Sequence, residues 1–544
     1  MNKVAQYLQQ HLSGEILESQ DVLDYFSTDE SILSIQPLLV EYPRSDSDIR
    51  KTARFAWQLA EKGKVVPITT RGMGTDLTGA SLGSGIILAM PAHLNKIIEL
   101  DPKTGIVTAE AGISLDKLQQ VLHTHGRFLP PISAVNKYGT LGGAVSNNDS
   151  GRFSYKYGPI QQFVRGLKVV LSNGEIIETG RITKRELNKK LGLASFEGEI
   201  YRSLDKLVEE SQDTLKVLSH ITDHNSAGFN ISDVKQKDGS FDLTPLFVGG
   251  QGTLGVIVEV TLDTEAYNPI QNLLIAGFNY RSQAWLAVKE INKLKEGPAS
   301  LDFIDKSLLV HLNNTNPAIL KPLDGSMPEV LIFMDIDDES QRNRKKIIKK
   351  LTKLLEQFEA DIIKPEDKDV EAWQRLLDSP SMYLTYSYGR KKAVPFLDDA
   401  QIPIEKVPEY FKELEGLMQT AGFSEYAVWG QAGNGLIHVA PSIDLGAVGE
   451  RQKLFKVMSA YYNYICSVGG CISGEYAEGR IRGAFNNLQH DENSIHVFNK
   501  IKSIFDPMKI MNPGVKDSTT LDDLKPIIRS EYKLDHQYSY LPRA

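Results

Sequence analysis

The chain has 544 residues, a formal net charge of −8 at pH 7 and a pI near 5.9, a length that allows several buried cores. The acidic balance argues against a nucleic-acid-binding protein, because neutralising a phosphate backbone requires a basic surface. The two cysteines, Cys466 and Cys471, are too few for an iron–sulfur cluster held by four thiolates. They could form a disulfide, but reduced thiols are typical of a cytosolic protein.

Residues 1–34 are predicted to form an N-terminal helical segment. Lys3, Glu15 and Glu18 interrupt its apolar stretches, so the segment lacks the continuous apolar region of a signal peptide. No later apolar run approaches the ~20 residues that a membrane-spanning helix needs. We therefore expect a cytoplasmic protein without a transmembrane segment.

A first domain is predicted over residues 35–264. Apolar residues at 37–42 indicate a strand, and the short oxygen side chains of Ser45 to Asp48 are typical of the start of a helix. That helix is expected to end at Gly63. Further strands are predicted at 86–90, 97–100 and 105–111.

Two later segments of this domain have distinct patterns. The pair Asn173-Gly174 stands between the apolar run at 169–171 and the segment Glu175-Ile176-Ile177-Glu178, which predicts a β-hairpin. The polar stretch at 223–242 is predicted to be a surface excursion. Strands and helices together indicate an α+β fold.

A glycine-rich loop at 71–79 follows the apolar run that ends at Ile68. It has neither the Gly-Lys-Ser/Thr of a Walker loop nor the three glycines that open a Rossmann helix. Its bare N–H groups and small hydroxyl side chains would allow close approach of an anion such as a pyrophosphate. Taken alone, such a loop is more often a plain turn between strands.

A second domain is predicted over 265–515, followed by a tail at 516–544. Residues 330–336 have strand character, and 341–359 have helical spacing. That helix carries apolar residues on one face and Arg and Lys on the other. It is either a solvated helix that covers a sheet or a basic helix that rests on an acidic membrane surface or partner.

Further glycine-rich motifs follow the loop at 71–79 in a specific order. They are Pro130-Pro131-Ile132-Ser133, 139–148, Tyr157-Gly158, 249–255, 433–435, 469–475 and 511–514. With these motifs the chain resembles the FAD-linked oxidases of the vanillyl-alcohol-oxidase type, whose FAD domain is called PCMH-type. The resemblance covers nearly the whole chain and is greatest to the D-lactate, glycolate and 2-hydroxyglutarate dehydrogenase branch.

The resemblance implies a PCMH-type FAD-binding domain of two subdomains and a C-terminal cap domain with an antiparallel sheet and helices. Some relatives attach the flavin through a histidine that aligns with Thr75, and a hydroxyl group cannot make that link, so we expect non-covalent FAD. The residues expected along the cofactor are Arg71, Gly72, Met73, Gly74, Thr75, Asp76, Gly79, Pro131, Ser133, Thr140, Gly142, Gly143, Asn147, Gly158, Gly252, Ile257 and Asn512.

The substrate side departs from the relatives. There, two histidines and a glutamate hold a divalent metal, and a further histidine accepts the hydroxyl proton; here these positions are Gln431, His438, Glu475 and Tyr476. An amide oxygen is a poor substitute for imidazole on zinc, so a bound metal is doubtful. A tyrosine, with an ordinary pKa near ~10, serves as a base at neutral pH only when nearby positive charge favours the phenolate.

Each of these residues also has a structural explanation. His438 could be a core histidine with satisfied nitrogens, whereas a charged Glu475 between glycines favours a functional role. Relatives bind the substrate carboxylate with an arginine three residues after a tryptophan; here Arg375 follows Trp373 by two. Arg375 is therefore a candidate ligand whose register is off by one.

The sequence thus predicts an FAD-dependent oxidoreductase that oxidises a D-2-hydroxy acid such as D-lactate or glycolate. Its electrons would pass to a separate acceptor: a quinone, an electron-transfer protein or oxygen. A flavin oxidase of a neutral alcohol or phenol is the alternative enzyme. The alternative outside catalysis is an electron-transfer subunit with little activity alone.

Overall fold

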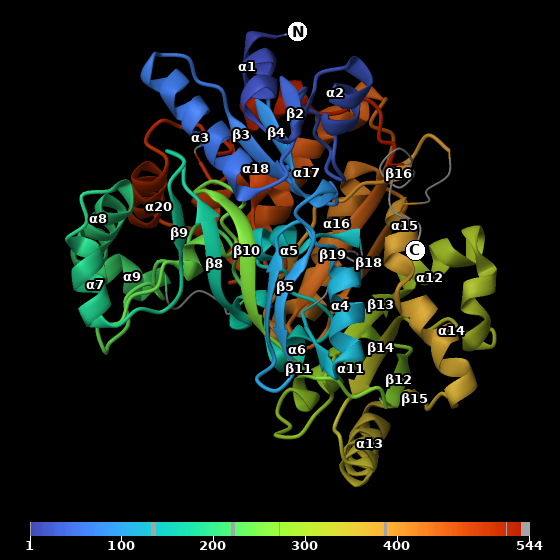
Figure 1. Ribbon diagram of the computed structural model, residues 1–544. Coiled ribbons are helices and arrows are strands. Elements are labelled where there is room, and N and C mark those ends of the chain that lie inside the picture. Colours follow the sequence, from blue (N-terminus) through green and yellow to red (C-terminus); the bar gives the residue numbers. More distant parts are fainter. Residues whose placement is uncertain are drawn as a thin grey trace.

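Figure 1 shows the computed structural model, which describes residues 2–131, 138–218, 224–270, 272–385, 389–517 and 519–534. It contains helices and three sheets of four or more strands. Two of these sheets are antiparallel, and the first has two parallel strand pairs and one antiparallel pair. The predicted α+β fold is confirmed. Among the described helices, none combines the length and the apolarity that a membrane span requires.

The first sheet gathers strands from the N-terminal 90 residues. Its order is β1 (Glu15–Leu17), β2 (Leu39–Tyr42), β4 (Ile86–Ala89) and β3 (Ile68–Arg71). Because β1 pairs with β2, residues 1–34 are not only helical, as predicted; they also supply a strand. The helices around this sheet are α1 (Lys3–His11), α2 (Gln20–Phe26) and α3 (Asp46–Glu61).

The C-terminal half of the chain returns to this sheet at β3. The main-chain N–H of Ile68 donates to the carbonyl of Ile510 at 2.7 Å, and the N–H of Asn512 donates to the carbonyl of Ile68 at 2.9 Å. Ile510 and Met511 are buried in the same core as the first sheet. The motif at 511–514 therefore lies beside the start of the glycine-rich loop.

The second sheet is wholly antiparallel. Its order is β5 (Ile97–Asp101), β6 (Ile106–Glu110), β10 (Val256–Asp263), β8 (Val164–Val170) and β9 (Ile176–Glu178). The predicted hairpin is confirmed, because β8 pairs with β9 and Gly174 in its turn has φ +84°. Helices of this half are α4 (Leu115–Thr124), α5 (Leu141–Asn147), α7 (Lys184–Leu191), α8 (Phe196–Glu210), α9 (Gln212–Leu218), α10 (Thr244–Phe247) and α20 (Glu492–Phe505).

The segment at 224–242 is not a surface excursion, so that prediction is wrong. Phe229, Ile231, Val234 and Phe241 are buried in the core of the second sheet. The prediction was based on the polar composition of the segment, but its few apolar side chains are enough to anchor an irregular backbone in the core.

The cap domain is built on an antiparallel sheet of eight strands, whose order in the sheet differs from their order in the sequence. The order is β15 (Asp361–Ile363), β12 (Asn272–Phe278), β14 (Val330–Ile336), β13 (Asp302–Asp305), β18 (Tyr426–Gln431), β19 (Leu436–Ile443) and β16 (Lys392–Ala393), and β17 (Ala400–Gln401) also pairs with β19. Alternate side chains of β12 lie in separate cores: Leu274 and Ala276 in one, Leu273 and Ile275 in the other. Helices therefore cover both faces of the sheet.

The helices on one face are α11 (Arg281–Ile291), α13 (Gln341–Leu355), α16 (Val407–Ala421) and α17 (Val448–Ser467). Those on the other face are α12 (Lys306–Thr315), α14 (Asp367–Leu377) and α15 (Ser379–Thr385). The remaining elements are short: β7 (Arg127–Phe128), α6 (Ser154–Tyr157), β11 (Glu265–Ala266), α18 (Gly479–Gly483), α19 (Asn486–Gln489) and α21 (Leu521–Leu524). Both cysteines are free thiols.

The described part of the C-terminal tail packs against the N-terminal segment. Ile528 bridges to Leu33, and Arg529 and Tyr532 are buried. Arg529 donates to the carbonyls of Asp29 and Ser31. The predicted limits at 34, 264 and 515 remain predictions.

Candidate functional site

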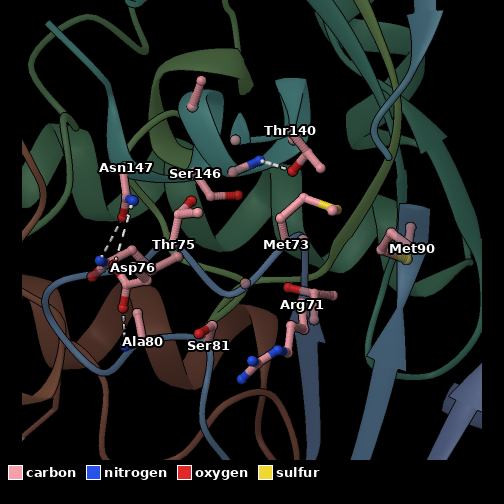
Figure 2. Close-up of a pocket in the computed structure, with 18 of the residues that line it drawn as sticks. Arg71, Met73, Thr75, Asp76, Ala80, Ser81, Met90, Thr140, Ser146 and Asn147 are labelled. Atoms are coloured by element: carbon pink, nitrogen blue, oxygen red, sulfur yellow. Dashed lines mark hydrogen bonds between the residues drawn. The ribbon is translucent and has the colours of Figure 1, made fainter. Parts of the chain in front are cut away.

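A pocket opens where the loop after β3 meets α5, the segment before β10 and the loop that carries Tyr476. Figure 2 shows this pocket with Arg71, Met73, Thr75 and Asp76 on its wall. The predicted cofactor residues that line it are Arg71, Gly72, Met73, Gly74, Thr75, Asp76, Thr140, Gly142, Gly143, Asn147, Gly252 and Ile257. The structure thus gathers twelve of the seventeen predicted residues around one cavity.

Glycines let the loops on the pocket wall approach one another. A Cβ on Gly72 would lie 2.4 Å from Oγ1 of Thr140, and one on Gly252, which has φ +70°, would lie 2.8 Å from Oγ1 of Thr70. Separations under 3 Å are too short for carbon, so larger residues would push the loops apart. Backbone groups are therefore exposed to whatever fills the pocket.

Asp76 fixes the shape of the glycine-rich loop. Its carboxylate accepts from the N–H of Ala80 at 2.6 Å and from the hydroxyl of Thr78 at 3.0 Å. Nδ2 of Asn147 donates to it at 3.5 Å, and Figure 2 shows the contacts of Asp76 with Ala80 and Asn147. Asn147 is in turn held by Gln251, whose Nε2 donates to Oδ1 of Asn147 at 2.8 Å.

Arg71 gives the pocket wall a buried positive charge with an unused hydrogen. Its side chain is 1% exposed, Nη2 donates to the carbonyl of Thr28 at 2.8 Å, and the guanidinium lies over the ring of Phe26. Nη1 is buried without a hydrogen-bond partner among the described residues. A buried cation with a free N–H fits an anion such as the pyrophosphate of FAD.

Four predicted cofactor residues do not line this cavity. Gly158 ends α6, and Pro131 is buried. Gly79 accepts from Nε of Arg480 at 3.1 Å. Asn512 supports the loop from behind, because its Nδ2 donates to the carbonyls of Ala80 and Gln251, each at 2.8 Å. Ser133 lies outside the described residues.

Tyr476 is the predicted substrate-side residue that reaches the cofactor pocket. It lines the cavity together with Thr75, Asp76 and Asn147, and it is 6% exposed. Its main-chain N–H donates to Oδ2 of Asp399 at 2.8 Å. Its role in catalysis stays a prediction.

His438 and Glu475 form a buried chain with Asp398. Nδ1 of His438 lies 2.7 Å from Oδ1 of Asp398, and Nε2 lies 2.6 Å from Oε2 of Glu475. Burial opposes charge on His438, but the two carboxylates raise the pKa of the imidazole well above its usual value. A protonated histidine that donates from both nitrogens has no lone pair to offer a metal.

The side-chain oxygen of Gln431 also already accepts hydrogen bonds from protein groups. Its Oε1 accepts from the hydroxyl of Ser154 at 2.7 Å and from Nδ2 of Asn434 at 3.1 Å. Among the described residues, no group of three His, Cys, Asp or Glu side chains is arranged to hold a metal ion. The absence of metal stays a prediction.

The structure does not bring Arg375 to the site, which corrects its predicted placement. Arg375 lies on the exposed face of α14, with a side chain that is 67% exposed and lies 3.8 Å from Glu371. Trp373, two residues earlier, is buried. Two residues correspond to about 200° around a helix, so the two side chains face opposite ways.

Sequence reasoning missed two groups of residues. The first completes the pocket wall: Thr70, Leu77, Ala80, Ser81, Met90, Ala111, Gly139, Ala144, Ser146, Gln251 and Gly255. Most lie inside or beside the glycine motifs, so motif limits drawn a few residues wider would have included them. The second group is Asp398 and Asp399 beside the Tyr476 loop, for which only tertiary contacts give a signal.

Known families match both halves of the chain. Residues 37–180 match the FAD binding domain, and residues 268–515 match the C-terminal domain of FAD linked oxidases. The chain belongs to the FAD-linked oxidase family. Its first half is therefore an FAD-binding domain, in agreement with the pocket and with Arg71.

Curated relatives have modest identity. The D-2-hydroxyglutarate dehydrogenase of Escherichia coli is 27% identical over 530 residues, which are 94% of this chain and 51% of the relative. The D-lactate dehydrogenase of Archaeoglobus fulgidus is 24% identical over 509 residues, 92% of this chain and 97% of the relative. The chain spans about half the length of the D-2-hydroxyglutarate dehydrogenases that it matches.

Solved structures share the fold. p-Cresol methylhydroxylase superposes with a TM-score of 0.71 at 14% identity, over 96% of this chain and 97% of that one. The 4-ethylphenol oxidase from Gulosibacter chungangensis gives 0.68 at 12% identity, over 95% and 97%. At such identities the likeness shows the fold alone, and it confirms the PCMH-type architecture.

Proposed function

We propose that this chain oxidises a D-2-hydroxy acid of the D-lactate or glycolate type, with non-covalently held FAD as the hydride acceptor. The observation that carries the proposal is the position of Tyr476 on the wall of the FAD pocket. The names of the relatives, D-2-hydroxyglutarate dehydrogenase, glycolate oxidase subunit and D-lactate dehydrogenase, support the substrate class.

The pocket residues would hold FAD through main-chain N–H groups and through the positive charge of Arg71. Arg71, with its unused Nη1, would face the pyrophosphate, and the N–H groups of the 72–76 loop would assist. Bound FAD supplies the redox chemistry by taking a hydride from the substrate and passing electrons onward. Thr75 lines the pocket and has no group that would form a covalent link to the flavin.

Tyr476 would take the substrate's hydroxyl proton as the hydride leaves the carbon. Tyr476 lines the pocket, and its main-chain N–H donates to Asp399. Next to it, Glu475 and His438, whose other nitrogen lies against Asp398, supply a fixed polar wall. These side chains would orient the substrate without a metal.

One observation favours a second candidate, oxidation of a neutral alcohol or phenol. Arg375 is not at the site, and two other arginines already pair with carboxylates: the partly buried Arg152 with Asp335 at 2.6 Å, and the buried Arg482 with Asp399. A substrate carboxylate would thus compete with protein carboxylates for its cation. A neutral substrate has no such requirement.

A substrate panel under anaerobic conditions tests the proposal. The FAD-loaded protein is mixed with D-lactate, glycolate, D-2-hydroxyglutarate, their L-isomers, neutral alcohols and 4-alkylphenols, and the flavin absorbance is followed. Bleaching by D-2-hydroxy acids alone supports the proposal, and bleaching by alcohols or phenols alone replaces it with the second candidate. No bleaching by any of them favours an electron-transfer subunit.

A separate acceptor would reoxidise the flavin, because two free thiols leave the chain without a four-cysteine cluster. A quinone, an electron-transfer protein and oxygen are the proposed alternatives. Adding each to the substrate-reduced protein and timing the return of flavin absorbance identifies the acceptor that reacts fastest. Cytoplasmic location stays a prediction.

A further inference from the structure

The loop that carries Tyr476 and Glu475 is held by one buried ion pair. Oδ2 of Asp399 accepts from the N–H of Glu475 at 2.7 Å and from the N–H of Tyr476 at 2.8 Å. Oδ1 of the same carboxylate pairs with Nη1 of Arg482. Both side chains are fully buried, at 0% and 1% exposure.

Arg482 holds the same loop through its main-chain carbonyl groups. Its Nη2 donates to the carbonyl of Tyr476 at 2.9 Å and to that of Ala477 at 2.8 Å. Four main-chain groups of three consecutive residues are therefore satisfied by two side chains. The carboxylate comes from the 398–399 segment beside β17 and the guanidinium from α18, so the pair joins separate parts of the fold.

The geometry points to a positioning role: we infer that Asp399 and Arg482 act as a clamp that places the Tyr476 phenol in the FAD pocket. The clamp also aims Glu475 at His438 and, for its effect on turnover, rests on the proposed function. Because Asp399 holds the main-chain N–H groups of Glu475 and Tyr476, the backbone at these two residues is fixed, and so are the directions in which their side chains leave it. A displacement of about 1 Å at a reacting group can cost a rate factor of roughly 100.

The planar guanidinium is required, because three acceptors lie around it. An ammonium group at the end of a lysine cannot reach Asp399 and both carbonyls in one plane. Arg482→Lys therefore keeps the charge and loosens the loop. Asp399→Asn keeps the shape but replaces the carboxylate with a neutral amide. The amide oxygen accepts more weakly than a carboxylate, and its N–H₂ faces either the two N–H groups of the loop or Arg482, so this variant also loosens the loop.

A matched control is available in Arg529. It is 6% exposed and donates to the carbonyls of Asp29, Ser31 and Lys533. None of these belongs to residues 475–477. Arg529→Lys thus reports the general cost of replacing a buried, carbonyl-bound arginine.

The first experiment is hydrogen exchange of the FAD-loaded protein, read on peptides that span 472–480. Arg482→Lys should speed exchange of the Glu475 and Tyr476 amides by about tenfold or more, whereas Arg529→Lys should leave that peptide unchanged. Unchanged exchange in Arg482→Lys would overturn the clamp. If this variant does not fold, Asp399→Asn replaces it with the same expectations.

The second experiment is a double-mutant cycle on the rate of flavin reduction by the best substrate of the panel. Arg482→Lys should slow reduction about 10- to 100-fold in the parent and by less than about twofold when Tyr476 is already phenylalanine, because the clamp acts through the phenol. An equal loss in both backgrounds contradicts the inference. If no substrate reduces the parent flavin, the proposed function fails, while hydrogen exchange still decides the clamp.

Discussion

Ser154 of the FAD-binding half donates its hydroxyl hydrogen to Oε1 of Gln431, 2.7 Å away in the cap domain. The contact joins the two halves at the position where the relatives are expected to have a metal-ligating histidine. It uses the amide oxygen that a metal would need. The site is thus held by a hydrogen bond where its relatives would use coordination.

This relationship predicts weak metal occupancy. Protein prepared without chelator should contain well under one equivalent of zinc or manganese, because Gln431 is engaged and the nitrogens of His438 both face carboxylates. Elemental analysis measures it. A stoichiometric metal that is lost on His438→Ala would contradict the prediction and restore a metal-assisted mechanism.

The flavin should be released intact by denaturation. Thr75 on the pocket wall provides no imidazole for a covalent bond, so acid precipitation should leave yellow FAD in the supernatant. Thr75→Ala is the control and should release flavin equally. Flavin that stays with the precipitated protein would rule out the non-covalent assignment.

Glu41 should make stability depend on pH. Burial raises the pKa of this carboxyl to about 8, although Thr52 donates to it at 2.7 Å. The folded state therefore keeps the proton between the ordinary pKa of glutamate, about 4.3, and about 8, whereas the unfolded state releases it. Stability should fall as pH rises through this window and level off above it.

Glu41→Gln removes this titration, so the variant should gain stability relative to the parent on going from pH 5 to pH 8, on the order of a few kcal/mol. Thermal unfolding of both proteins at the two pH values measures it. Glu99→Gln, at an exposed position of β5, is the control. A constant difference between Glu41→Gln and the parent at both pH values would show that Glu41 is already ionised when folded.

The basic helix α13 packs as predicted on the cap sheet, with Ile347, Leu351 and Leu355 buried; in Figure 1 it lies at the lower edge of the molecule. Six of its seven cations are exposed: Arg342, Lys345, Lys346, Lys349, Lys350 and Lys353. Lys346 lies 3.0 Å from Glu296. Contact with an anionic membrane surface stays a prediction.

If α13 makes this contact, the protein should sediment with phosphatidylserine vesicles and not with phosphatidylcholine vesicles. Lys345→Glu/Lys349→Glu should weaken binding by about tenfold or more, at roughly 1 kcal/mol per lysine near the surface. The same change at Lys184 and Lys189, exposed on α7, is the control. Equal binding by both variants, or none by the parent, would leave α13 a solvated helix.

Local chemistry made much of the fold predictable. The Asn173-Gly174 turn and the glycine loop at 71–79 need particular residues whatever surrounds them, so the sequence identified both. Asp399 could not be identified, because two adjacent acids resemble a surface turn until tertiary contacts bring residues 475 and 476 to them. The prediction for Arg375 was wrong because it counted residues from Trp373 and did not consider that the two side chains point to opposite faces of α14.

The role of Tyr476 is tested most directly by stopped-flow flavin reduction with the best substrate of the panel. Tyr476→Phe keeps the ring and removes the proton acceptor, so reduction should slow by something like 10²–10⁴-fold with FAD still bound. In the parent the rate should rise with pH, because only phenolate accepts the proton. Tyr201→Phe, at a buried tyrosine of α8, should keep the parent rate. A Tyr476→Phe protein that reduces its flavin as fast as the parent at every pH would contradict the account.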